Sequence, residues 1–380
     1  MSGNPIFKIS SLLCVHILLW NTSQAQFKVR LNIGSSSAYE YNVFNANPSR
    51  QRLQNGQVVN PLQSGYFQRM EGQFQLSKKG QYQTLALDVS AQYDYFPNLE
   101  VANVLRPNLK LNYRLHPSKN HRFSVTARRM EYRTNRPEDD TEVLRPPRSY
   151  TRTQVNTKYQ WKLGNRNTSY VDISWRQQEY DTPENRTFFY HAWSGLISSE
   201  QVLYKSKQHK HKLQMKASYS QRRYWDEELD DEDLVEEEER DWRYMEASLA
   251  YSWRHKKGLN IRLGMEWNQR QDLIQDRFGY QQFESNLQIG VRKKKVEWTM
   301  KASFAERRYQ TLTINSTSND LLIHYYVRTG MEVKWKIKKK TALYIGVRGI
   351  HRRRNSNENA RIFLDYDNVI TRLGIKQTLF

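Results

Sequence analysis

The chain has 380 residues, a formal net charge of +21 and a mean hydropathy of −0.89. A basic and polar chain could be a nucleic-acid binder or a disordered polymer. An aromatic content of 13%, with 10 Trp and 24 Tyr, argues against both. The single cysteine, Cys14, lies in a segment that we expect to be removed, so the mature chain would hold neither disulfides nor thiolate metal sites.

Residues 1–25 have the pattern of an export signal. The apolar run over 9–20 has the length of a signal-peptide core and is too short to span a bilayer. Small residues follow at the two positions that a signal peptidase reads, Ser23 and Ala25, which predicts cleavage before Gln26. An anchor helix is the alternative, but no second apolar stretch extends the segment. A lipoprotein is disfavoured because no small residue precedes Cys14.

From residue 26 onward, apolar and polar residues alternate with a period of two. In the run from 83 to 96, Leu87 and Val89 alternate with Asp88 and Ser90. This period predicts β-strands, since a helix would need apolar residues three and four apart. The same alternation returns in the runs 109–116, 155–163, 247–253, 261–267 and 323–337.

The connections between these runs alternate in length. The short ones, rich in polar and basic residues, are 78–80, 117–120, 164–167, 205–210, 256–258, 293–295 and 338–340. The long ones are approximately 34–66, 97–105, 134–149, 181–188, 225–242, 273–280, 309–322 and 354–366. Seven hairpins, one strand before the first long loop and one after the last predict about 16 strands.

This rhythm is typical of an all-β, antiparallel, up-and-down transmembrane barrel, because a closed barrel pairs every backbone group without an edge. We expect one domain over 26–380, with both ends on the short-turn, periplasmic side. The weakest strand is expected near 189–204, where the two faces mix. Loop 34–66 is the candidate to fold inward.

Aromatic residues cluster where the two interfacial girdles of such a barrel would lie. We expect one girdle near the short turns, made of Trp161, Trp253, Trp298 and Trp335. We expect the other near the long loops, made of Tyr95, Trp175, Tyr180, Trp267 and Tyr309.

The last strand, 369–380, is amphipathic and ends on Phe380. It resembles the signal that Gram-negative outer-membrane proteins present to the barrel-assembly machinery, although Gln377 interrupts its apolar face. The segment 38–44, Ala-Tyr-Glu-Tyr-Asn-Val-Phe, resembles the start of β-barrel porins found with exopolysaccharide-export systems. The Lys-rich and Tyr-rich style is similar to outer-membrane proteins of Bacteroidetes. These resemblances imply a porin-like barrel of the outer membrane.

The face that would point into the barrel is rich in charge, with more basic than acidic residues. One interpretation is a hydrated, cation-lined pore that favours anions. The other is cross-strand ion pairing, since Glu266 and Glu332 have basic neighbours on adjacent predicted strands, and the two can coexist. The candidate pore-lining residues are Arg30, Lys110, Arg114, Arg128, Lys158, Arg176, Arg262, Arg292, Lys301, Arg328, Arg348 and Arg372.

Other features of the sequence give weaker indications of a functional site. The acidic run 226–241 lacks the spacing of a calcium loop and is interpreted as a solvated outer loop. The pair His209 and His211 could contact a metal, but an exposed polar turn accounts for it. The chain has no serine-hydrolase, zinc-protease or phosphate-loop motif. We therefore expect no enzymatic activity, no cofactor and no metal site.

The leading hypothesis is a porin-like outer-membrane channel for hydrophilic solutes, anions or polysaccharide among them. The second is a non-conducting barrel that acts as a partner or scaffold in envelope secretion or export. The third is a barrel enzyme. The expected contacts are outer-membrane lipid, lipopolysaccharide, the barrel-assembly machinery and envelope export partners, and no nucleic acid is expected.

Overall fold

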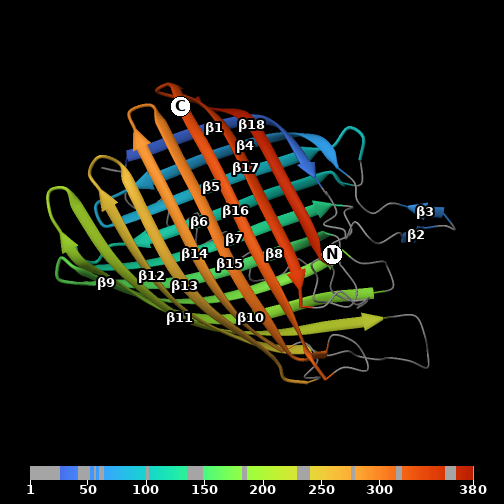
Figure 1. Ribbon diagram of the computed structural model, residues 1–380. Helices are drawn as coiled ribbons and strands as arrows, with labels where there is room; N and C mark the ends of the chain where they lie inside the picture. Colours follow the sequence, from blue (N-terminus) through green and yellow to red (C-terminus); the bar gives the residue numbers. More distant parts are fainter. Residues whose placement is uncertain are drawn as a thin grey trace, which may run out of the picture.

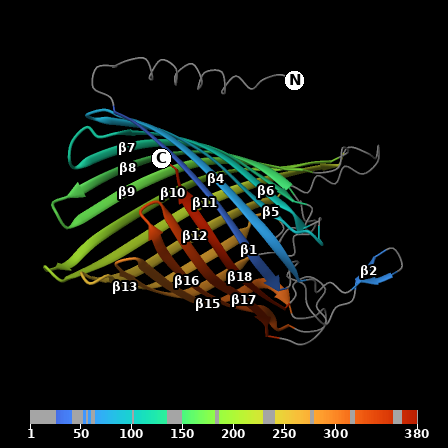
Figure 2. The same cartoon turned by 90° about the horizontal axis from the view of Figure 1, so that it is seen from above.

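The computed structural model describes residues 26–41, 52–54, 57–59, 64–99, 102–134, 149–181, 186–228, 240–274, 279–313, 319–355 and 365–379. The signal segment 1–25, most of loop 34–66 and Phe380 lie outside these residues. Figures 1 and 2 show a barrel of long, tilted strands with the short turns gathered at one end. Among the described residues, no helix is long and apolar enough to cross a membrane.

Sixteen of the strands form the barrel wall. Their bounds are β1 Gln26–Tyr41, β4 Gly65–Lys79, β5 Gln83–Tyr95, β6 Val104–Leu115, β7 His121–Thr134, β8 Ser149–Leu163, β9 Asn167–Asp181, β10 Arg186–Lys205, β11 His209–Glu228, β12 Arg240–His255, β13 Leu259–Asp272, β14 Tyr280–Lys293, β15 Val296–Thr313, β16 Leu321–Lys338, β17 Thr341–Arg354 and β18 Tyr366–Thr378. A separate hairpin, β2 Arg52–Gln54 and β3 Gln57–Val59, lies between β1 and β4.

The wall closes because β1 pairs with both β4 and β18. Asn32 of β1 lies opposite Gln73 on one side and Thr378 on the other. Every neighbouring pair in the wall is antiparallel, and the order around the barrel follows the chain. The structure thus confirms the prediction of a closed, all-β barrel of 16 strands. Gln26 and Thr378 both lie at the short-turn end, as predicted.

The period of two separates the wall into two faces. Val89 of β5 is 42% exposed on the outer face, and Asp94, further along the same strand on the inner face, is 2% exposed. Large apolar side chains such as Ile173, Trp193 and Leu263 are likewise exposed on the outer face. An apolar outer face and a polar inner face are the arrangement of a barrel whose surroundings are less polar than its lumen.

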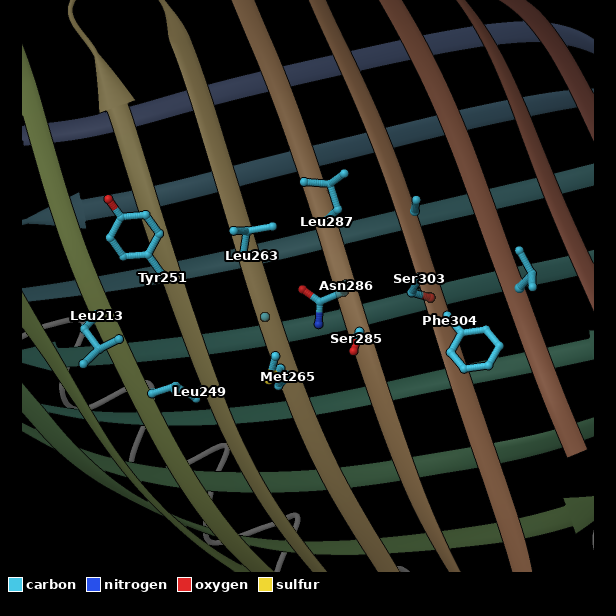
Figure 3. A pocket seen from close by; sticks show the side chains of 13 residues that line it. Leu213, Leu249, Tyr251, Leu263, Met265, Ser285, Asn286, Leu287, Ser303 and Phe304 are labelled. Atoms are coloured by element: carbon cyan, nitrogen blue, oxygen red, sulfur yellow. The ribbon is translucent and has the colours of Figure 1, made fainter. Parts of the chain in front are cut away.

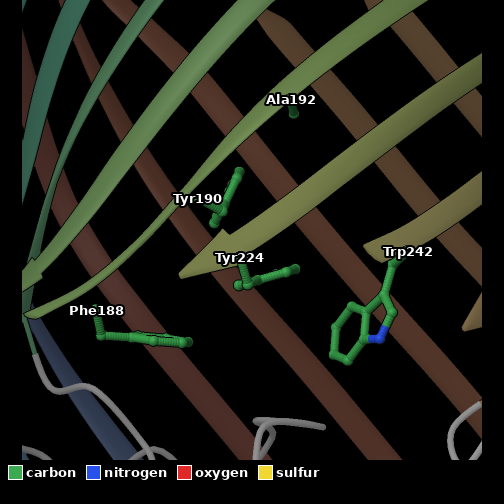
Figure 4. Close-up of a cluster of buried hydrophobic side chains, with 5 residues drawn as sticks. All are labelled: Phe188, Tyr190, Ala192, Tyr224 and Trp242. Atoms are coloured by element: carbon green, nitrogen blue, oxygen red, sulfur yellow. The ribbon is translucent and has the colours of Figure 1, made fainter. Parts of the chain in front are cut away.

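The inner face is packed near the long-loop end. Figure 4 shows one cluster there, formed by Phe188, Tyr190, Ala192, Tyr224 and Trp242 from β10, β11 and β12. Aromatic rings pack across the strands: the ring of Phe188 stacks on that of Tyr224 at 5.9 Å, and the rings of Tyr190 and Tyr224 meet at a tilt with 4.9 Å between their centroids. Aromatic rings therefore cover the inner face of these three strands at the long-loop end.

The strands extend further than the loop rhythm predicted. β1 continues through Gly34 to Tyr41, because Ser36, Ala38 and Glu40 keep the inward alternation and are buried. The predicted weak strand is β10, a strand of 20 residues whose register shifts between Val202 and Tyr204.

Two tyrosines placed in the outer girdle by the sequence lie elsewhere. Tyr309 is 1% exposed and belongs to an inner cluster with Tyr280 and Leu322. Tyr180 packs against the inner cluster of β10–β12, its ring 4.9 Å from that of Phe188. The prediction was wrong for these two because closeness to a loop does not set the face, whereas alternation along the strand does.

Candidate site on the inner wall

The candidate cations from the sequence occupy the inner register positions of their strands. Arg30 lies opposite Gln75 of β4, Gln75 lies opposite Asp88 of β5, and Asp88 lies opposite Lys110 of β6. Lys110 in turn lies opposite Arg128 of β7. The remaining candidates on this face are Arg114, Lys158, Arg176, Arg262, Arg292, Lys301, Arg328, Arg348 and Arg372. Whether they line a pore remains a prediction.

Three of these candidates meet at one place near the short turns. A hollow of about 330 Å³ is lined by Arg30, Lys110 and Arg114, together with Lys28 and Asp88. Lys28 and Arg30 come from β1, and Lys110 and Arg114 come from β6. We call this the basic hollow.

The register explains why the space exists. On β4 and β5, between the cationic strands, the inner positions hold Ser77, Thr84 and Ala86. Ser77 lies opposite Lys28, and Thr84 lies opposite Arg114. Short side chains on the two central strands thus form a floor, and long cationic side chains stand at both edges.

The carboxylate of the basic hollow is held by amides. Asp88 Oδ2 accepts hydrogen bonds from Gln73 Nε2 at 2.8 Å and from Gln75 Nε2 at 2.6 Å. Within the described residues, neither Lys28 nor Arg30 has a carboxylate oxygen within 4.0 Å, and the same holds for Lys110 and Arg114. The basic hollow thus holds four cationic side chains and one carboxylate, so it carries a positive potential that suits an anion.

A neighbouring hollow of about 340 Å³ on the same wall has a different charge balance. There Lys376 Nζ lies 2.9 Å from Glu71 Oε1, and Arg106 Nη1 lies 2.9 Å from Asp94 Oδ2. Arg128, a predicted pore-lining residue, donates from Nε to Asn108 Oδ1. Because most of these charges are paired, the second hollow should attract an anion more weakly than the basic hollow does.

Some of the other candidate cations form ion pairs with carboxylates, and others do not. Arg328 pairs with Glu284 at 3.2 Å, and Arg372 pairs with Glu332 at 3.5 Å. The ammonium of Lys158 lies over the ring of Tyr170, 3.2 Å from its centroid. Ion pairing and unpaired cations therefore coexist on this wall.

Two further charged residues form hydrogen bonds with amide side chains instead of ion pairs. Arg262 donates to Gln214 at 3.1 Å. Glu266 accepts a hydrogen bond of 2.7 Å from Asn268, a residue of its own strand. Arg176, Arg292, Lys301 and Arg348 keep their inner register positions but line neither of the two hollows.

Sequence reasoning missed a belt of arginine and aromatic side chains near the long-loop end. The guanidinium carbon of Arg270 lies 4.4 Å from the ring centroid of Trp242 and 4.6 Å from that of Tyr280. The same stacking repeats around half of the barrel. Its members on successive strands from β10 to β18 are Tyr190, Arg222, Tyr244, Arg270, Tyr280, Arg307, Tyr326, Arg352 and Tyr366.

Most of this arginine–aromatic belt is buried, and Arg270 has no exposed surface. Stacked guanidinium groups on rings are favourable when desolvated, and a planar group loses little freedom there. The available sequence signal was the alternation of arginine and aromatic residues at equivalent inner positions of consecutive strands. That signal becomes visible only once the strands are aligned.

The histidine pair lies on the outer face beside a short turn. Trp253 Nε1 donates to His209 Nδ1 at 3.2 Å, and His211 Nδ1 is 2.5 Å from the hydroxyl of Tyr251. Both imidazoles therefore contact aromatic side chains of β12. Among the described residues, no three His, Cys, Asp or Glu side chains gather where they could hold a metal. Most of the acidic run 226–241 lies outside the described residues.

Comparison with known proteins supports the fold. No family profile matches the chain, and no curated protein resembles it in sequence. Among solved structures, Acinetobacter baumannii OccAB3 is similar with a TM-score of 0.53 and 9% identity, over 93% of this chain and 99% of that one. OccAB1 of the same organism is similar with a TM-score of 0.51 and 8% identity, over 93% and 97%. At these identities the likeness establishes a shared barrel fold.

Proposed function

We propose that the chain is a porin-like outer-membrane channel for hydrophilic solutes with a preference for anions. The observation that carries the proposal is the basic hollow, where four cations without ion partners among the described residues stand on the inner wall. A barrel of 16 strands encloses enough space for an aqueous passage.

The wall would act on an anion through fixed charges rather than through a tight site. The positions of Lys28, Arg30, Lys110 and Arg114 are set by backbone register. The side chain of Asp88 is committed to two amides, so it competes weakly for the cations. Attraction that is strong enough to favour entry and weak enough to allow release is what conduction needs.

The proposal includes a location in the outer membrane. The apolar outer face would contact lipid, and the signal segment 1–25 would direct export and be removed. The short-turn end would then face the periplasm and the long loops would face lipopolysaccharide. The amphipathic last strand supports assembly by the barrel-assembly machinery.

Reconstitution of the full protein in planar bilayers tests the channel. We expect discrete conductance steps from folded protein and none from heat-denatured protein. Folded protein that inserts into the bilayer and stays silent would contradict the proposal.

A non-conducting partner or scaffold in envelope export is the second candidate. The arginine–aromatic belt favours it, because packed side chains such as Arg270 cover the inner face of β10–β18 near the long loops. An ion-tight, correctly inserted barrel would support this role. The same bilayer measurement therefore separates the two candidates.

A further inference from the structure

A hollow of about 600 Å³ opens on the outer wall across β11–β16 (Figure 3). Its lining is almost wholly apolar. It arises because Ser285 lies between Met265 and Phe304 in the register, while Ala302 lies beside Leu287. The two short side chains leave space among the bulky ones around them. We call it the apolar hollow.

Three turns rich in lysine close the same wall at its short-turn end. They contribute eight exposed lysines and no acidic residue. We call this surface the lysine shelf. Its members are Lys256, Lys257, Lys293, Lys294, Lys295, Lys338, Lys339 and Lys340.

Backbone hydrogen bonds join the turns of the lysine shelf to their neighbours. Arg292 N donates to Gly258 O at 3.0 Å, which ties the first turn to the second. Lys336 N donates to Lys295 O at 2.8 Å, which ties the second turn to the strand that leads into the third. The backbones that carry these lysines are therefore held side by side along one edge of the wall.

The spacing between shelf and hollow matches one leaflet of a bilayer. Leu263 of the hollow follows Gly258 by five residues, which is roughly 17 Å along a strand. At the tilt of about 35–45° usual for such barrels, this length is about 12–14 Å along the barrel axis. A hydrocarbon core is about 30 Å thick, so one leaflet supplies about 15 Å. Outer-face rings at Trp253, Trp298 and Trp335 lie between the two, at the level expected for an interface.

We propose that this wall binds an anionic phospholipid, with its phosphate on the lysine shelf and an acyl chain in the apolar hollow. This site is separate from the proposed channel and goes beyond it. A second copy of the barrel is disfavoured, because it would bring its own lysines against the shelf. An acidic protein could reach the shelf but not a hollow that lies deep along the strands.

The test uses the full protein, purified in detergent and titrated with dioleoylphosphatidylglycerol or dioleoylphosphatidylcholine, with bound lipid counted by native mass spectrometry. We expect phosphatidylglycerol to bind about tenfold more tightly, since clustered lysines attract anionic headgroups. The combined variant K256Q/K257Q/K294Q/K295Q should lose this preference. The variant S285L/A302L fills the apolar hollow and should weaken binding of both lipids.

The control is K78Q/K79Q, which removes two lysines from the end of β4 at its short turn, outside the wall that bears the apolar hollow. It should keep the preference. Equal binding of the two lipids to the wild type would overturn the inference. So would an unchanged preference in the shelf variant, unchanged binding in the filled variant, or an equal loss in the control. A silent barrel that prefers phosphatidylglycerol would overturn the channel and keep the lipid site.

Discussion

The backbone amide of Arg292 donates a 3.0 Å hydrogen bond to the carbonyl oxygen of Gly258, and this contact leaves no room for a side chain at residue 258. Gly258 has a φ of 99°, and a Cβ there would lie 2.0 Å from Arg292 O. Gly258→Ala should therefore cost about 1–3 kcal/mol or more of unfolding free energy. Urea titration of vesicle-inserted protein measures it.

Gly164 is the matched control for that substitution. Its φ is 66°, but a Cβ there would meet nothing within 4 Å. Gly164→Ala should cost only the free energy of holding an alanine at a positive φ, about 1 kcal/mol. Equal losses in the two variants would show that the close approach of Arg292 does not matter.

The carboxylate of Asp94 should be important for stability. Asp94 is 2% exposed, and it accepts from Arg69 Nε at 2.6 Å and from Arg106 Nη1 at 2.9 Å. Asp94→Asn leaves two guanidinium groups without their shared anion, so we expect a loss of about 3–5 kcal/mol. The pair of Glu131 with Arg133, whose side chain is 67% exposed, is the control, because Glu131→Gln should change stability by about 0–1 kcal/mol.

The arginine–aromatic belt predicts that Arg270 cannot be replaced by lysine without loss. An ammonium keeps the charge but lacks the planar group that lies against Trp242 and Tyr280. Arg270→Lys should lower the unfolding free energy by about 1–2 kcal/mol. Arg128→Lys, at an exposed inner position without a stacked ring, should stay within about 0.5 kcal/mol. If both variants match the wild type, stacking contributes nothing.

His116, in the turn after β6, reports the positive potential of the short-turn end. Partial burial lowers the pKa of this imidazole, and the charges of Arg122, Arg114 and Lys79 lower it further. Arg122→Gln should therefore raise the pKa, which NMR titration of labelled histidine measures. Lys340→Gln, at the turn between β16 and β17, should leave it unchanged. A His116 pKa at or above the ordinary imidazole range would contradict the charge arrangement.

The shifted pKa also fixes the sign of a pH effect. The folded state binds a proton at His116 less readily than the unfolded state does. Protonation of this imidazole therefore favours the unfolded state as the pH falls. Its effect is absent at high pH, where the imidazole is neutral in both states. Stability should fall as pH drops through the ordinary imidazole range, and less so in Arg122→Gln.

The alternation of residues such as Leu87 and Asp88 was enough to predict the strand count and the closed barrel. A strand with one apolar face can orient in only one way, and the alternation of short turns and long loops then predicts an even number of strands. The extension of β1 was missed because Ser36 and Ala38 are small and carry little hydrophobic contrast. Tyr309 was misplaced because a ring near a loop can lie on either face.

The candidate site was only partly predictable. The inner position of Arg30 or Lys110 follows from alternation, but their meeting in one hollow depends on the pairing of β1 with β4 and of β5 with β6. The ion pair of Arg372 with Glu332 spans β16 and β18, and only the three-dimensional wall reveals it. Register across strands is long-range information that no single run of residues carries.

The reversal potential across a planar bilayer under a salt gradient tests the central claim most directly. The basic hollow predicts that the wild-type channel passes chloride more readily than potassium. The combined variant K28Q/R30Q/K110Q/R114Q should shift the reversal potential toward zero while conductance steps persist. A cation-selective wild type, or a variant with unchanged anion selectivity, would contradict the account.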